Sequence, residues 1–174
     1  VQVRLTSGED DILIVSHSGH AARFSEELVR SMGRDTSGIK GMNVKGKDNR
    51  VLAMDIARND TEQFVVTENG YGKRTPVSDY PIKGRGTKGV LTIRLTEKTG
   101  GLAGALIVNP HQDLLFISQN GLVQRTGGVG ISETGPSTHG VRVSNITDTE
   151  RASPVALSAA TPRPVRARRW SRPG

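Results

Sequence analysis

QFVVTENGYGKRT, residues 63–75, is the middle copy of three similar segments, and it decides the fold. It aligns without gaps with ILIVSHSGHAARF (12–24) and with LLFISQNGLVQRT (114–126), each time at an offset of 51 residues. In each copy an apolar run with β-branched residues is followed by Ser-Gly or Asn-Gly and then by a more polar run. An Asn-Gly pair between two such runs is typical of a β-hairpin, because a type I′ turn needs positive φ at both central positions. The sequence therefore predicts the same hairpin three times.

The 51-residue period extends beyond the hairpins. The other segments in register are TSGI (36–39), TKGV (87–90) and THGV (138–141), and the opening VQVRL (1–5) with LAMDI (52–56) and AGALI (103–107). Further short strands are expected near VLTIRL (90–95) and LAGALIV (102–108), which makes roughly four strands in about 50 residues, the range of a β-propeller blade. We therefore predict an all-β fold, a partial β-propeller (β-pinwheel) of about three four-stranded blades.

The repeats also predict how the chain is divided. Residues 1–157 form the repeat region, and residues 158–174 form a Pro- and Arg-rich tail that is expected to be disordered because it has no periodicity. Within the repeat region, residues 1–9 end a preceding blade, and the three repeats are 10–60, 61–111 and 112–157.

The stretch that follows each hairpin is expected to be a loop. EELVRSMG (26–33) could form a helical turn, but the equivalent VSDYPIKG (77–84) and GVGISETG (128–135) are not expected to do so. A loop is the conformation that all three copies can share.

Composition and charge limit the classes of function. The chain has 174 residues and no cysteine, which excludes disulfides, thiolate zinc sites and a cysteine nucleophile. It has no apolar run of about 18 residues, so no membrane-spanning helix is expected. The formal charge is +7, but the tail holds five arginines and no acid, so the rest of the chain carries only +2. Any binding of nucleic acid therefore depends on where individual bases lie.

KGRGTKG (83–89) has its glycines in the pattern G-x-G-x-x-G, which is also the fingerprint of dinucleotide-binding loops. That fingerprint works after a buried strand and at the start of a helix. Here Pro81 precedes the loop and a strand-like run follows it, and the equivalent MGRDTSG (32–38) and TGPSTHG (134–140) keep only some of the glycines. We interpret the loop as a lookalike, and keep a nucleotide-using enzyme as an alternative hypothesis.

Three longer segments carry a resemblance to a known family. SMGRDTSGIKGM (31–42), NGYGKRT (69–75) and YPIKGRGTKGVL (80–91) resemble the C-terminal domain of the DNA gyrase A protein. The resemblance extends over residues 1 to 157 and includes all three repeats in order.

The hallmark heptapeptide of that family, the gyrase box, reads Q-R-R-G-G-K-G. Residues 83–89, called the box loop below, match it at Arg85, Gly86, Lys88 and Gly89 and depart from it at the other three positions.

The resemblance implies a six-bladed, propeller-like disc whose strands are exchanged between neighbouring blades. It implies that the domain binds duplex DNA around a basic rim and wraps it, which supports negative supercoiling by a type IIA DNA topoisomerase. The implied partners are double-stranded DNA and, through the parent A2B2 complex, the gyrase B protein, with no membrane. The implied location is the bacterial cytoplasm, at the nucleoid. No cofactor is expected in this chain, since ATP and Mg²⁺ would be used by other parts of the parent enzyme.

Two sets of residues are singled out as candidates. The bases expected to contact DNA phosphates are Arg23, Arg34, Lys40, Lys73, Arg74, Lys83, Arg85, Lys88, Arg125 and Arg142. The glycines expected to allow positive φ or a close approach of two backbones are Gly33, Gly38, Gly84, Gly89, Gly135 and Gly140. The bases of the box loop are the foremost candidates for DNA contact.

The arginines at 23, 74 and 125 recur with the repeat, and a salt bridge or a solvated strand face is the alternative role for them. No catalytic residue and no metal site are assigned, because the four histidines show no ligand spacing with carboxylates. A protein-binding propeller and the equivalent domain of topoisomerase IV remain alternative functions.

Overall fold

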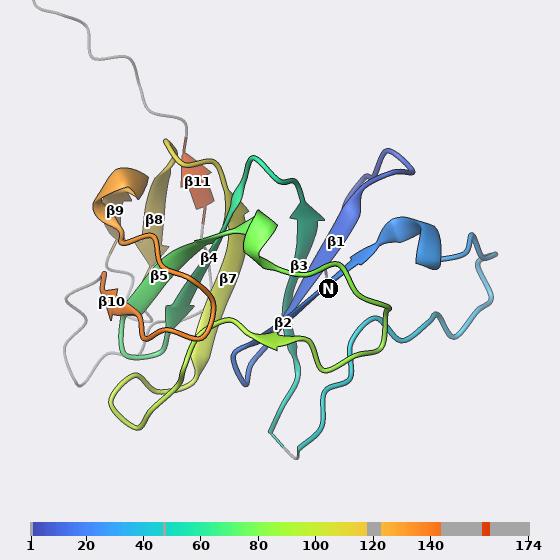
Figure 1. The fold of residues 1–174 in the computed structure, drawn as a ribbon, viewed down its shortest axis with the longest axis horizontal. Helices are drawn as coiled ribbons and strands as arrows, with labels where there is room; N and C mark the ends of the chain where they lie inside the picture. Colours follow the sequence, from blue (N-terminus) through green and yellow to red (C-terminus); the bar gives the residue numbers. More distant parts are fainter. Residues whose placement is uncertain (1, 47, 118–122, 144–157, 161–174) are drawn as a thin grey trace, which may run out of the picture.

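The computed structural model describes residues 2–46, 48–117, 123–143 and 158–160, which form three antiparallel sheets arranged side by side (Figure 1). The first blade has the strand order β3-β1-β2-β6, the second has β10-β5-β4-β7, and the third has β11-β8-β9. The strands are β1 (Asp11–Ser16), β2 (His20–Ser25), β3 (Val51–Ala57), β4 (Glu62–Thr67), β5 (Tyr71–Pro76), β6 (Val90–Leu91), β7 (Leu102–Val108), β8 (Asp113–Ile117), β9 (Val123–Gly127), β10 (Val141–Arg142) and β11 (Ser158–Ala160). The predicted all-β fold of repeated blades is confirmed.

The three predicted hairpins are β1–β2, β4–β5 and β8–β9. Their registers are equivalent, since Leu13 pairs with Arg23 in the first and Leu115 pairs with Arg125 in the third. The turn glycines Gly19 and Gly70 both have φ of +77°, a conformation that residues with a Cβ rarely adopt. The turn of the third hairpin lies outside the described residues.

Each of the first two blades is completed by a strand from the following repeat. β6 belongs to the second repeat but pairs with β2 of the first, where Val90 lies opposite Ala21. In the same way β10 of the third repeat pairs with β5 of the second, where Val141 lies opposite Gly72. The strands are therefore exchanged between neighbours. The corresponding residues of the first repeat, Ile39 and Lys40, form no strand within the part of the chain that is described.

The third blade reaches further along the chain than the sequence indicates. β11 pairs with β8, with Ala160 opposite Asp113, one residue out of register with the first blade, where Ala57 of β3 lies opposite Asp11. The first three residues of the segment 158–174 therefore belong to a sheet. The rest of the expected tail lies outside the described residues.

The expectation of a plain loop after each hairpin is wrong. A three-residue 3₁₀ helix follows every hairpin: η1 (Glu26–Leu28), η2 (Val77–Asp79) and η3 (Gly128–Gly130). Each is closed by a backbone hydrogen bond from the residue after it, such as Tyr80 N–H to the Val77 carbonyl at 3.1 Å. One i→i+3 turn needs no helical periodicity, so it forms even from the Gly-rich sequence of η3.

The apolar core lies between the blades. One cluster joins β1 of the first blade, with Leu13 and Val15, to Tyr80 and Leu102 of the second repeat. A second cluster joins the second and third blades, where the rings of Phe64 and Phe116 meet edge to face at 5.7 Å. Each blade is thus stabilised mainly by its neighbour. No helix in the described part of the chain is long and apolar enough to cross a membrane.

Candidate nucleic-acid interface

The box loop, residues 83–89, runs along the outer edge of the first blade. It leads directly into β6, the edge strand opposite β3. Its start is held by Lys83 N–H, which donates to the Arg23 carbonyl at 2.9 Å. Its middle is held by Gly86 N–H, which donates to the Gly41 carbonyl at 2.6 Å. The loop of the second repeat is therefore fastened to residues of the first.

Two glycines of the box loop have the conformations that only glycine adopts easily. Gly86 has φ of +77° and Gly89 has φ of +81°. A Cβ on Gly89 would lie 2.2 Å from the Ala21 carbonyl oxygen, so a larger residue would push the loop off β2. Gly89 thus fulfils both expected roles, positive φ and close backbone approach.

The other candidate glycines divide into two groups. A Cβ on Gly140 would lie 3.1 Å from backbone atoms of Gly72, which is the same approach to β5. Gly38 keeps φ of +73° but has nothing within 4 Å of its Cβ position. The same space is open around Gly33, Gly84 and Gly135, and none of these three has positive φ, so nothing in the structure requires glycine there.

The bases of the box loop are exposed. The side chains of Lys83, Arg85 and Lys88 reach solvent, and so does Lys40 on the segment that the loop crosses. Arg85 Nε donates to the Leu28 carbonyl at 3.2 Å, which leaves the rest of its guanidinium to the surface. None of the three lysines forms an ion pair with a described residue. The two repeats together therefore present a positively charged surface.

Lys88 also affects a neighbouring histidine. The pKa of His20 at the start of β2 is lowered, chiefly by burial and further by the charge of Lys88. A hydrogen bond with the Ser18 carbonyl opposes the shift. The imidazole therefore favours its neutral form beside the box loop.

Arg23 and Arg74 lie elsewhere, between the blades. Their side chains are 4% and 8% exposed, and each pairs with an acid twelve residues earlier in the chain. Arg23 binds Asp11 at 2.7 Å and donates to the Val77 carbonyl at 2.9 Å. Arg74 binds Glu62 at 2.5 Å and donates to the Ile131 carbonyl. The salt-bridge alternative therefore describes these two arginines, and burial keeps them from DNA phosphates.

Arg125 repeats the pairing but not the burial. It forms an ion pair with Asp113 from the same position on its hairpin, yet its side chain is 50% exposed. The three acids, Asp11, Glu62 and Asp113, were not among the candidate residues. Their 51-residue spacing could have revealed them, since each precedes a recurring arginine by the same distance.

Lys73 is also buried, contrary to its assignment as a DNA contact. Its Nζ donates to the Gly135 carbonyl at 2.6 Å, to Thr138 Oγ1 at 3.0 Å and to the Pro136 carbonyl at 3.3 Å. Burial lowers the pKa of Lys73 to about 8. The residue fastens the loop of the third repeat to β5. The equivalent positions of the other two repeats hold Ala22 and Gln124.

The last two candidates, Arg34 and Arg142, are both exposed. Arg34 lies on the loop of the first repeat that corresponds to the box loop. Arg142 belongs to β10, where it pairs with Tyr71 on the outer edge of the second blade.

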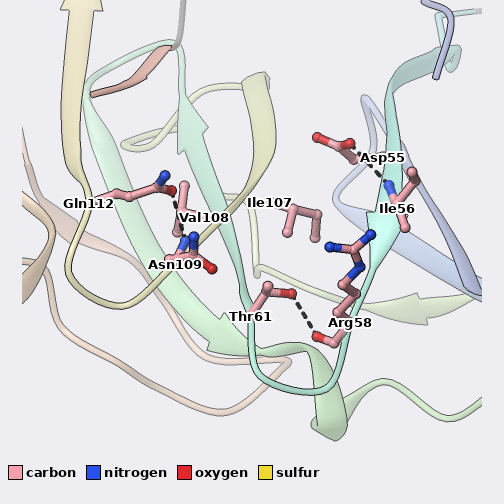
Figure 2. Close-up of a pocket in the computed structure, with 8 residues that line it drawn as sticks. All are labelled: Asp55, Ile56, Arg58, Thr61, Ile107, Val108, Asn109 and Gln112. Carbon is pink, nitrogen blue, oxygen red and sulfur yellow. Dashed lines mark hydrogen bonds between the residues drawn. The ribbon is translucent and has the colours of Figure 1, made fainter. Parts of the chain in front are cut away.

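A separate cavity lies away from the box loop, between the ends of β3 and β7 (Figure 2). Its volume is about 310 Å³, and residues Asp55, Ile56, Arg58, Thr61, Ile107, Val108, Asn109 and Gln112 line it. Two of its polar side chains take part in local turns, since Thr61 Oγ1 donates to the Arg58 carbonyl and Gln112 Oε1 accepts from Asn109 N–H. Asp55 pairs with Arg4. The cavity contains no residue of the glycine-rich box loop. That loop itself is followed by a strand, not by a helix that could receive a pyrophosphate.

Antiparallel blades that exchange strands with their neighbours define the chain as a propeller-type repeat protein. The model of the family "DNA gyrase C-terminal domain, beta-propeller" matches residues 10–57, 64–109 and 112–156, one match per repeat. The chain therefore belongs to the DNA gyrase C-terminal β-propeller family.

Curated relatives agree with this assignment. The DNA gyrase A protein of Mycolicibacterium smegmatis is 42% identical over 157 residues, which are 89% of this chain and 18% of the relative. The DNA gyrase A protein of Staphylococcus aureus is 39% identical over 158 residues, which are 90% of this chain and 18% of the relative. The chain thus spans less than a fifth of the length of these proteins.

Solved structures share the fold. A DNA gyrase A C-terminal domain superposes with a TM-score of 0.79 at 26% identity, covering 88% of this chain and 51% of that one. The C-terminal domain of a DNA topoisomerase IV superposes with a TM-score of 0.83 at 21% identity, covering 91% and 49%. The second likeness is one of fold alone, while the family match and the curated relatives favour gyrase.

Proposed function

We propose that this chain binds duplex DNA without sequence preference along the outer edge of its blades and bends it, as the DNA-wrapping part of a type IIA topoisomerase. The observation that carries the proposal is the surface formed by Lys40, Lys83, Arg85 and Lys88. Four exposed bases from two repeats meet there, and the lysines have no ion-pair partner among the described residues.

The physical basis is the charge of the DNA backbone. Duplex DNA carries one negative charge per about 1.7 Å of its axis, and each phosphate that a base neutralises releases a counterion. Phosphate contacts hold the duplex in place without reading its sequence. The chain has only three phenylalanines, two tyrosines and one tryptophan, which disfavours binding of single strands by stacking on bases.

Bending requires contacts along a curved edge. Bending a site of 20–30 base pairs costs of order 1–6 kcal/mol, so one cluster of bases is not sufficient. Arg34 on the first repeat and Arg142 on the second blade extend the exposed charge along the same series of outer strands and loops. The box loop is the densest part of this series.

The remaining assignments concern the parent protein. We propose that the chain acts within a gyrase A2B2 assembly in the bacterial cytoplasm, at the nucleoid, and meets the gyrase B protein only through that assembly. ATP and Mg²⁺ would be used by other parts of the enzyme. The chain itself contributes DNA binding and no catalytic group.

The test is the salt dependence of duplex binding by a variant with Lys83, Arg85 and Lys88 changed to glutamine. Each lost phosphate contact lowers the slope of log K against log salt by about 0.9, so the slope should fall by about 3 units if all three bind phosphate. Scrambling the DNA sequence should change neither slope.

Two control proteins separate the box loop from other charges. Arg58→Gln removes an exposed base at the opposite end of the first blade and should leave the slope unchanged. Removal of residues 161–174 should weaken binding less than the triple change. The proposal fails if that truncation abolishes binding while the triple variant binds as the parent chain does.

A further inference from the structure

The loop of the third repeat, residues 134–140, is held in the same way as the box loop, 51 positions earlier. Thr134 N–H donates to the Arg74 carbonyl at 2.9 Å. This bond corresponds to the one between Lys83 N–H and the Arg23 carbonyl, which is also 2.9 Å long. Each loop then enters an edge strand, β6 beside β2 and β10 beside β5 (Figure 1). The two loops therefore start and end at equivalent points of neighbouring blades.

The backbone between these points is also related. Ser137 has φ of +47°, the one positive value at a non-glycine residue in the described chain, and its equivalent in the box loop is Gly86, with φ of +77°. A serine keeps such a conformation only where its surroundings hold it. Here Ser137 N–H donates to the Leu91 carbonyl at 3.1 Å, and the Lys73 ammonium binds the same loop. The loop of the third repeat thus matches the box loop at its start, at its left-handed residue and at its exit.

The two loops differ in charge. The box loop carries three permanent bases, whereas the loop of the third repeat, TGPSTHG, contains none. Its one titratable side chain is His139, which occupies the position of Lys88. His139 is exposed and forms no ion pair with a described residue. Histidine gains its charge as the pH falls from about 8 to about 5, so this position changes from neutral to basic in that range.

The elements packed around His139 carry more bases than acids. Their charged and titratable groups are Tyr71, Lys73 and Arg74 on β5, Arg94 after β6, Arg142 on β10 and Glu133 before the loop. Arg94 lies beside the loop, since its backbone N–H donates to the carbonyl of the residue before His139 at 3.2 Å. The side chain of Arg94 is exposed and forms no ion pair within the described ranges. These surroundings favour an anion as the ligand.

We propose that protonated His139 binds a DNA phosphate at the edge of the second blade, with Arg94 beside it as a permanent contact for the same stretch of duplex. The proposal rests on the function proposed above, and it adds a site at which DNA binding takes up a proton. A duplex that bends from the box loop along the outer strands reaches β10 next, because β6 and β10 are equivalent edge strands of neighbouring blades. The loop of the third repeat has no permanent base, so contact there strengthens as the pH falls.

The first test compares the salt dependence of duplex binding at about pH 8 and about pH 5.5, with a linear duplex of random sequence. Each added phosphate contact steepens the slope of log K against log salt by about 0.9, so the slope of the parent chain should be steeper by about 0.9 at the lower pH. His139→Gln should keep the shallower slope at both pH values, and His139→Lys should have the steeper slope at both. The inference is wrong if the slope of the parent chain does not depend on pH, or if the increase persists in His139→Gln.

Two other histidines provide controls. His111 lies on the turn after β7, at the opposite edge of the second blade from β10, and His111→Gln should keep the pH dependence of the parent chain. His20 lies beside the box loop, where burial and the charge of Lys88 lower its pKa, so it gains its charge at a lower pH than an ordinary histidine. His20→Gln should therefore also keep the increase. Loss of the increase in His20→Gln but not in His139→Gln would place the proton at the box loop and overturn the inference.

Calorimetry measures the proton directly. Duplex binding at about pH 6.5 in two buffers of different ionisation enthalpy should show a net uptake of protons by the parent chain. The uptake should be smaller in His139→Gln and unchanged in His111→Gln. Equal uptake by these two variants would contradict a proton at His139.

A further variant tests the permanent contact. Arg94→Gln should lower the salt slope by about 0.9 at both pH values, with an unchanged circular dichroism spectrum, and an unchanged slope would overturn the role of Arg94. A histidine is neutral at about pH 8, so binding there tests the function proposed above without His139. A parent chain that does not bind duplex DNA at about pH 8 would contradict that function. Binding with the same slope at both pH values would contradict only the site at His139.

Discussion

The basic residues of the hairpin strands and those of the box loop have similar chemistry but opposite surroundings. Arg23 and Arg74 recur at the same place in their repeats and are buried in ion pairs between blades. Lys83, Arg85 and Lys88 occur together in one repeat only and are exposed. In a repeat protein every unit needs the same contacts with its neighbours, so a charge that recurs and is buried serves the interface. Occurrence in a single copy does not by itself place a charge on the surface, since Lys73 occurs once and is buried against the loop of the third repeat.

The largest loss of unfolding free energy is expected when the buried Arg74 is replaced, and the half-exposed Arg125 provides the comparison. Arg74→Met leaves the Glu62 carboxylate buried without a partner, which should cost about 3–5 kcal/mol of unfolding free energy. Arg125→Met removes the half-exposed pair with Asp113 and should cost at most about 1 kcal/mol. Urea denaturation of both variants measures the difference. Equal losses would show that burial between blades does not distinguish the recurring arginines.

The box-loop glycines should show the next largest effect. Gly89→Ala forces a Cβ against the Ala21 carbonyl and onto a left-handed backbone, so a loss of about 2–5 kcal/mol is expected in thermal or urea unfolding. Gly84→Ala, five residues earlier, adds a Cβ in open space and should change stability by no more than about 0.5 kcal/mol. A tolerated Gly89→Ala would mean that the loop is not held against β2.

The buried Lys73 should make the unfolding free energy depend on pH, which an exposed lysine would not do. Its pKa is about 8 in the folded protein and 10.5 when unperturbed, so between these values the unfolded chain binds more protons. The unfolding free energy of the parent chain should therefore rise from pH 8 to 10.5 relative to Lys73→Gln, and the difference should be constant below pH 8. Unfolding curves in urea at several pH values measure it. A difference between the two proteins that does not vary with pH would indicate that Lys73 is solvated.

The smallest expected effect concerns a single exposed base. Lys40→Gln should lower the slope of log K against log salt for duplex DNA by about 0.9, with no change in protein stability. Arg74→Lys should instead lower the stability of the protein and leave the slope unchanged, because it alters a buried ion pair and no phosphate contact. An unchanged slope for Lys40→Gln would restrict the binding surface to the box loop itself.

The repeat made the secondary structure predictable. The hairpins follow from local patterns that occur three times, so each copy supports the others. The strand after the box-like loop forms in the second and third repeats but not in the first. The 3₁₀ helices were missed because a single turn leaves no periodic signal, as in the Gly-rich η3. The strand β11 was missed because residues 158–174 were assigned to a tail without periodicity, although the first three of them pair with β8.

The sequence by itself determined that the chain is built from three equivalent β units and that the box loop carries a local excess of positive charge. Only the tertiary structure decided which bases reach solvent. The repeat pattern alone makes phosphate contact plausible for Arg23, Lys73 and Lys83. In the folded chain the first two are covered when the next blade packs against their hairpin. Burial depends on contacts between segments far apart in the chain, and it sets whether a charge is neutralised inside the protein or available to bind DNA.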